Sequence, residues 1–252
     1  MTNQSSLSFC HVFMPRLQED APPRLNWSIC PPHPVLGPDE VHLWLGDADQ
    51  AAWQPATRQH VLSDEEKARA ARFRFDRDRD RFIVRHALLR EIIAQYLSLE
   101  PARIQLAVNA RGKPELMGDA SMRELQFNLS TSGPVVLYGF TRRRQIGIDV
   151  EQVRREVNWM EIAAEFFHPE EVRCLRGSPE AGREELFFAH WTMKEAFVKA
   201  RGLGLQRPLL ETDFTAIVRQ GRGVLTDADG SAWLCASLRP GNHLLGALVL
   251  QS

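Results

Sequence analysis

The chain has 252 residues, enough for one large domain or two small ones, and its 44% hydrophobic and 25% charged residues exclude a disordered or fibrous protein. Its formal net charge of -1 excludes a global field that would attract nucleic acid or anionic lipid, so any electrostatic function is local. The four cysteines have no CxxC spacing, which argues against a zinc site and predicts a reduced, cytoplasmic protein. No stretch resembles a membrane span or a signal peptide.

The first predicted element is an extended N-terminal arm. Residues 1–38 contain seven of the 15 prolines and show little periodicity, which is typical of an arm without packed structure. A strand is predicted at 41–45 from alternating apolar residues. Ser63 and Glu66 form a capping-box pattern that predicts the start of a helix, and apolar residues at helical spacing predict a second helix from near Asp80.

Short alternating runs from Ile104 onward predict an antiparallel meander that ends in the strand 145–151. Helices are then predicted at 159–167, from Pro169, and from 178 to Gly202. A second meander is predicted with strands at 214–218, 224–226, 232–238 and 244–250. Helices before a meander, twice over, predict an α+β fold of two halves, which we expect at 39–143 and 144–252.

Two carboxylates stand two residues apart in the strand 145–151. Asp149 and Glu151 therefore leave the same face, with Cα atoms roughly 6 to 7 Å apart. Such a pair can hold one hard divalent cation, and Mg²⁺ bound in this way suits a phosphate substrate. The alternative is a solvated outer face, because Ile148 and Val150 would be buried on the opposite side.

The long predicted helix carries a second candidate group. Trp191, Glu195 and Lys199 follow one another at intervals of four residues and so form one stripe about 12 Å long. A Glu four residues before a Lys is also a common surface pair worth only about 0.2–0.5 kcal/mol, so the pattern has an ordinary structural explanation.

A basic segment is the third candidate. Residues 67–90 contain nine Lys or Arg and three Asp, an excess of six positive charges in a neutral protein. This predicts an anion site; the alternatives are a helix face with internal ion pairs and, given the interleaved phenylalanines, a surface that stacks nucleic-acid bases. Lys113 adds a cation in a predicted turn.

These segments together resemble the Sfp-type 4'-phosphopantetheinyl transferases. The resembling runs occur in the family's order: LSDEEKARAARFRF (62–75), DRDRF to ALLR (78–90), GKP (112–114), FNLSTSG (127–133), GIDVE (147–151) and WTMKEAFVKARGLGL (191–205). The resemblance implies two similar halves related by a pseudo-twofold axis, each an antiparallel sheet packed with helices, with coenzyme A bound between them. It also implies transfer of the 4'-phosphopantetheine arm of coenzyme A to a serine of an apo acyl or peptidyl carrier protein, with release of adenosine 3',5'-bisphosphate.

The resemblance further implies a role for each matching residue. Asp149, Glu151 and Glu195 would hold Mg²⁺, Glu195 would also deprotonate the acceptor serine, and Lys199 would contact the pyrophosphate. Contacts to the coenzyme A phosphates are expected from Arg81, Lys113, Ser130 and Thr131, and Lys67 and Arg69 match nearby positions in a looser register. The family usually has a histidine where this chain has Thr131, so a charge-assisted hydrogen bond of about 1.5–3 kcal/mol is missing there.

The partners follow from the same resemblance. We expect coenzyme A and an apo carrier protein, no nucleic acid and no membrane, and a monomer, because one chain can form the whole cleft. Carrier docking is predicted at 159–171, with Glu170 and Glu171 on the exposed side; the alternative is that Ile162, Ala163, Phe166 and Phe167 are the core face of a short helix. The alternative function is a non-catalytic relative that binds coenzyme A or a nucleotide, with Thr131 as the mark of a decayed site.

Overall fold

The computed structural model describes residues 8–13, 25–29, 31, 33–109, 112–153, 158–202 and 208–252. Parts of two predicted segments lie outside the described residues: residues 1–7, 14–24, 30 and 32 of the N-terminal arm, and residues 203–205 of the family motif. No described helix has the length and apolarity needed to cross a membrane.

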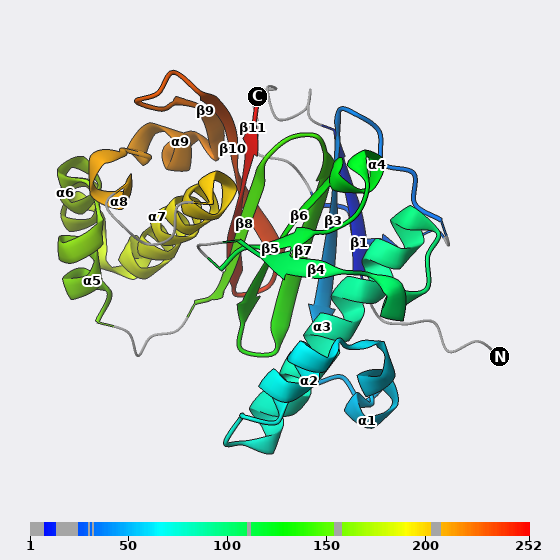
Figure 1. Cartoon of the computed structure of the whole chain (residues 1–252). Coiled ribbons are helices and arrows are strands. Elements are labelled where there is room, and N and C mark those ends of the chain that lie inside the picture. The colour runs from blue at the N-terminus through cyan, green and yellow to red at the C-terminus, as the bar shows by residue number, and fades with distance from the viewer. Residues whose placement is uncertain are drawn as a thin grey trace.

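Two antiparallel sheets form the centre of the molecule (Figure 1). The strands of the first sheet are, in spatial order, β2 (Ser28–Ile29), β1 (Ser8–Phe13), β3 (Glu40–Asp47), β7 (Val135–Arg142) and β6 (Leu125–Ser132). The strands of the second are β8 (Ile146–Gln152), β11 (Leu244–Gln251), β10 (Ala232–Gly241) and β9 (Arg222–Thr226). The short pair β4 (Leu106–Val108) and β5 (Pro114–Leu116) stands apart from both. The predicted α+β class with two sheet-containing halves is confirmed.

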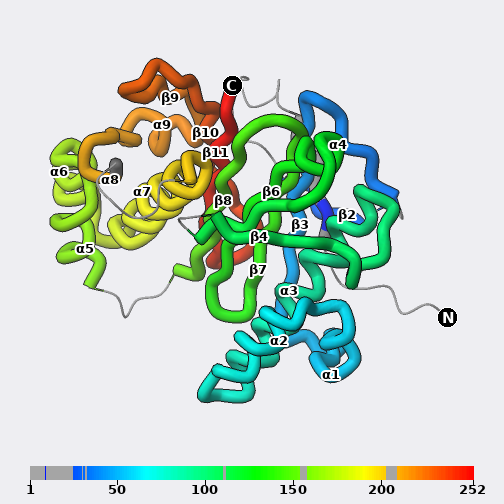
Figure 2. The backbone as a smooth tube through the Cα atoms, viewed as in Figure 1, coloured from blue at the N-terminus to red at the C-terminus, as the bar shows by residue number. Residues whose placement is uncertain are grey.

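The sheets pack face to face because their strands alternate apolar residues between two sides. Leu43 and Leu137 of the first sheet meet Ile148 and Leu248 of the second in one buried cluster. The opposite faces are each covered by a helix of 22 residues, α3 (Asp76–Leu97) on the first sheet and α7 (Glu180–Arg201) on the second. The order of layers is therefore helix, sheet, sheet, helix, and Figure 2 shows the blue-to-green and yellow-to-red parts of the chain side by side.

The remaining helices lie around these layers. In the first part of the chain they are α1 (Pro55–Arg58), η2 (Gln59–Val61), α2 (Asp64–Ala70), η3 (Pro101–Arg103) and α4 (Ala120–Arg123). In the second part they are α5 (Trp159–Phe166), α6 (Pro169–Gly177), α8 (Pro208–Glu211) and α9 (Thr215–Gln220). The predicted capping box of α2 is confirmed, because the Ser63 amide donates to Glu66 Oε2 at 2.8 Å and the Glu66 amide donates to Ser63 Oγ.

Several predicted elements differ from those observed. Residues 8–13, expected in an arm, form β1 in full register with β3, and Phe9 is buried. The strand β8 leaves the first meander and pairs with β11 instead. The strand predicted at 214–218 is wrong: the segment forms α9, whose first turn begins where the Thr215 amide donates to the Asp213 carboxylate at 2.8 Å. Short apolar runs do not distinguish strand from helix.

Candidate active site

A glycine allows the long helix α7 to lie directly on β8. A Cβ built on Gly147 would stand 2.0 Å from the Ala196 carbonyl oxygen and 2.3 Å from the Ala200 amide nitrogen, so only glycine fits this close approach. Residues 149 and 151 share the face of Gly147 because strand residues alternate. The packing therefore brings both carboxylates of β8 beside the stripe of α7.

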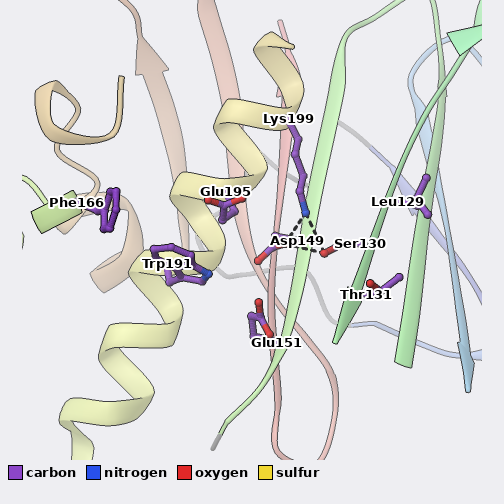
Figure 3. A pocket seen from close by; sticks show the side chains of 9 residues that line it. All are labelled: Leu129, Ser130, Thr131, Asp149, Glu151, Phe166, Trp191, Glu195 and Lys199. Carbon is purple, nitrogen blue, oxygen red and sulfur yellow. Dashed lines mark hydrogen bonds and ion pairs between the residues drawn. The ribbon is translucent and has the colours of Figure 1, made fainter. Parts of the chain in front are cut away.

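Lys199 connects the helix, the strand β8 and the strand β6 (Figure 3). Its Nζ donates to Asp149 Oδ1 at 2.6 Å and to Ser130 Oγ at 3.0 Å, and Ser130 Oγ donates to the same Asp149 oxygen at 2.6 Å. Asp149 is 3% exposed, so the solvated outer face considered for this residue is wrong. Lys199 thus reaches across to β8 instead of lying along its own helix surface.

Glu195 lies between Trp191 and Lys199 on the same stripe, as the spacing predicted. Its Oε1 atom is buried and has no hydrogen-bond partner. Burial raises the pKa of Glu195, and the negative charges of Asp149 and Glu151 raise it further against the opposing charge of Lys199. The side chain is therefore a carboxylate of increased basicity that faces other carboxylates.

These groups line one pocket of about 390 Å³ at the junction of β6, β8 and α7. Its lining residues are Leu129, Ser130, Thr131, Asp149, Glu151, Phe166, Trp191, Glu195 and Lys199. The aromatic rings of Phe166 and Trp191 meet edge to face with their centroids 6.3 Å apart and form an apolar part of the pocket wall. We call this cavity the acidic pocket.

A second pocket of about 400 Å³ adjoins the first, because Leu129 and Thr131 line both. Its other lining residues are Arg69, Phe73, Asp78, Arg81, Phe82, Arg85, His86 and Gly133. Arg81 is held there by the Asp49 carboxylate, which accepts from Nε at 2.6 Å. Arg85 donates to the Gly133 carbonyl, and its buried Nε has no partner. We call this cavity the arginine pocket.

Two predicted phosphate contacts lie outside both pockets. The exposed Lys67 pairs with Asp64 at 3.4 Å. Lys113 lines a smaller cavity and donates from Nζ to the Ile146 carbonyl at 3.1 Å. Burial lowers the pKa of Lys113 to about 8. The structure therefore brings together Arg69, Arg81, Ser130 and Thr131 of the predicted contacts, and leaves these two lysines apart.

The predicted metal ligands share the acidic pocket without converging on one point. Within the described residues, no three His, Cys, Asp or Glu side chains stand close enough to form a metal-binding group. Asp149 is paired instead with Lys199, whose Nζ lies 2.6 Å from Asp149 Oδ1. The donor set nevertheless fits Mg²⁺, because it consists of carboxylate oxygens and two of them, Asp149 Oδ2 and Glu195 Oε1, are buried without partners.

Comparison with known proteins identifies the family. Residues 145–247 match the model of the 4'-phosphopantetheinyl transferase superfamily, and residues 48–139 match that of a 4'-phosphopantetheinyl transferase N-terminal region. The 4'-phosphopantetheinyl transferase HetI of Nostoc sp. is 36% identical over 225 residues, which cover 89% of this chain and 93% of HetI. This chain belongs to the 4'-phosphopantetheinyl transferase superfamily.

Other transferases match over different lengths. The Sfp protein of Bacillus subtilis is 30% identical over 148 residues, which cover 59% of this chain and 63% of Sfp. The L-aminoadipate-semialdehyde dehydrogenase-phosphopantetheinyl transferase of Pongo abelii is 29% identical over 227 residues, covering 82% of this chain and 72% of the relative. The predicted family and the predicted enzyme class are confirmed.

Sequence reasoning assigned no individual pocket contact to Phe166, Arg85 or His86, although Arg85 belongs to the basic segment 67–90 and Phe166 to the predicted docking segment. The place of Arg85 beside Arg81 was predictable, because the two residues are four apart in a helix and so share one face. Phe166 was expected either in a docking surface or in the core face of a short helix, and its place in the acidic pocket was not predicted.

Proposed function

We propose that this transferase moves the 4'-phosphopantetheine group of coenzyme A to a serine of an apo acyl or peptidyl carrier protein. The serine oxygen bonds to the phosphorus next to the pantetheine arm, and the bond from that phosphorus to the bridging oxygen breaks. Adenosine 3',5'-bisphosphate leaves with the bridging oxygen, and the serine proton passes to the enzyme. Phosphoryl transfer of this kind needs chiefly positioning and neutralisation of charge.

Glu195 is the proposed general base. Glu195 lines the acidic pocket and its Oε1 atom has no hydrogen-bond partner, which supports this role, because its carboxylate could accept the serine proton directly or through one water.

Lys199 and the arginine pocket are proposed to hold the anionic part of coenzyme A. Lys199 contacts Ser130 of β6 and Asp149 of β8, and it would stabilise charge on the departing phosphate. The neighbouring pocket presents Arg69, Arg81 and Arg85, and the unpartnered Nε of Arg85 offers a buried donor for a phosphate oxygen. Thr131, between the two pockets, would donate its hydroxyl.

Asp149, Glu151 and Glu195 are the proposed ligands of Mg²⁺. The ion, when bound, would neutralise pyrophosphate charge. The support is the all-oxygen donor set, which favours a hard cation over zinc. Because residues from one chain line both pockets, we also propose that the monomer is sufficient, in a reduced cytoplasmic setting as the cysteine spacing predicts.

The observation that carries the proposal is that Asp149, Glu151, Glu195 and Lys199 line one pocket beside the arginine pocket. The experiment incubates the protein with apo carrier protein, coenzyme A and Mg²⁺ and weighs the intact carrier by mass spectrometry. A gain of one phosphopantetheine group that disappears after exhaustive chelation is expected. Binding of coenzyme A without any mass gain would instead identify the non-catalytic relative, and full transfer after chelation would refute the metal assignment.

A further inference from the structure

Three polar side chains on one face of β6 reach the neighbouring strand β8. Asn128 Oδ1 accepts from the Ile148 amide at 2.9 Å, Ser130 Oγ donates to Asp149, and Ser132 Oγ donates to Glu151 Oε2 at 2.6 Å. The two strands belong to different sheets, so these side chains take the place of a backbone ladder between them. Each of the three is at most 6% exposed.

The hydrogen bond of Ser132 has a fixed direction. Its oxygen accepts from the Gln152 amide at 3.0 Å, and a backbone amide can only donate. The single hydroxyl proton is therefore directed away from that amide, toward Glu151 Oε2 at 2.6 Å. A short hydrogen bond to a carboxylate belongs to the stronger class, and burial limits competition from water.

We propose that Ser132 is a positioning residue that holds the Glu151 carboxylate at the acidic pocket. Glu151 has three side-chain torsions and stands one residue before the end of β8, so without a restraint its carboxylate would lose conformational freedom on binding a cation. The Ser132 bond removes much of that freedom beforehand. This inference rests on the proposed function, in which Glu151 is a ligand of Mg²⁺.

The test measures metal affinity instead of turnover. Mn²⁺ serves as the probe, titrated into the protein in the presence of coenzyme A and followed by electron paramagnetic resonance. Removing a partner that orients a metal ligand typically weakens metal binding 10–100-fold, so Ser132→Ala should raise the Kd for Mn²⁺ by roughly that factor. The matched control is Ser237→Ala on β10, a strand serine outside both pockets whose buried hydroxyl has no partner; its Kd should equal the wild-type value.

Two further variants separate positioning from simple support of the fold. Ser132→Thr keeps a hydroxyl and should restore most of the affinity; if it does not fold, Ser132→Cys should lie between wild type and Ser132→Ala. In a Glu151→Ala background, Ser132→Ala should cause no additional loss of Mn²⁺ affinity, because the carboxylate it orients is gone.

The possible failures are distinguishable. A wild-type protein that binds no Mn²⁺ would contradict the proposed metal site itself. A wild-type protein that binds Mn²⁺ with an unchanged Kd in Ser132→Ala would overturn the positioning role alone. Equal losses of affinity in the presence and absence of the Glu151 carboxylate, or a loss reproduced by Ser237→Ala, would also overturn it.

Discussion

Thr131 lies where the acidic and arginine pockets meet, at the position where the family usually has histidine. Its exposed side chain lines both cavities, so a larger cationic group placed there has access to an anion in either. A charge-assisted hydrogen bond is worth about 1.5–3 kcal/mol, against about 0.5–1.5 kcal/mol for an ordinary one. Thr131→His should therefore tighten coenzyme A binding by up to roughly tenfold near pH 6.

Calorimetric titration of both proteins at pH 6 and pH 8 checks this prediction. The gain should be larger at pH 6, where the imidazole is protonated. Equal affinities of the two proteins at both pH values would show that the arginines of the second pocket already supply the missing charge.

The burial of Lys113 leads to a second prediction, which concerns how the free energy of unfolding depends on pH. Burial lowers the pKa of Lys113 to about 8, whereas the unfolded chain has the ordinary value of about 10.5. Between these values the unfolded state binds more protons, so the free energy of unfolding contributed by Lys113 rises with pH from about 8 to about 10.5. Urea unfolding across this range should show the rise in wild type relative to Lys113→Met; parallel curves for the two proteins would contradict it.

Gly147 determines how closely helix α7 packs on strand β8. Its Cβ position lies within 3 Å of backbone atoms of α7, which cannot rotate away as a side chain can. Gly147→Ala should therefore displace α7 and with it Glu195 and Lys199, at a cost of about 1–3 kcal/mol or more. The matched control is Gly182→Ala near the start of α7, where an added Cβ meets nothing within 4 Å.

Thermal unfolding and transfer rate together check this prediction. We expect Gly147→Ala to lose both stability and activity and Gly182→Ala to keep both. A Gly147→Ala protein with wild-type transfer would show that α7 tolerates a shift away from β8.

The elements show which parts of the fold are predictable from sequence. The start of helix α2 was predicted to the residue because its capping box is local, and Gly202 closes α7 as expected. The pairing of β1 with β3 and of β8 with β11 was not predictable, since strands that pair across a long stretch of sequence leave no local pattern. α3 starts at Asp76 and not near Asp80, because acidic residues in its first turn stabilise the helix N-terminus.

In α6, part of the predicted docking segment, the burial of Glu171 was likewise not predictable from sequence. Glu171, placed on the exposed side by its sequence, is completely buried and pairs with Lys194 at 2.8 Å, and its carboxylate also accepts from the Phe214 amide. Neither partner is close in sequence, so only the fold reveals the cluster. Charge reversal at Glu171 would disrupt this core, whereas the exposed Glu161 and Glu165 of α5 remain usable probes of carrier docking.

At the scale of the whole molecule, the site lies where the two sheets meet at their edges. We propose that the sheet of β1–β3, β6 and β7 with α3, and the sheet of β8–β11 with α7, correspond to the halves expected at 39–143 and 144–252. The acidic pocket takes residues from both, which explains why motifs some twenty to seventy residues apart, such as Ser130, Asp149 and Lys199, join in one hydrogen-bonded group. Sequence motifs identified most of these residues, but the contact between Lys199 and Asp149 required the fold.

The most direct test of the account compares wild type with Glu195→Gln. The substitution keeps the side chain's shape and removes its ability to accept a proton, and loss of a general base typically slows transfer by roughly 10²–10⁴. Intact-mass measurement of the carrier protein over time should show rapid gain of phosphopantetheine with wild type and a rate lower by that factor with Glu195→Gln, while calorimetry shows that the variant still binds coenzyme A. Transfer by Glu195→Gln at the wild-type rate would contradict the assignment of the acidic pocket as the active site.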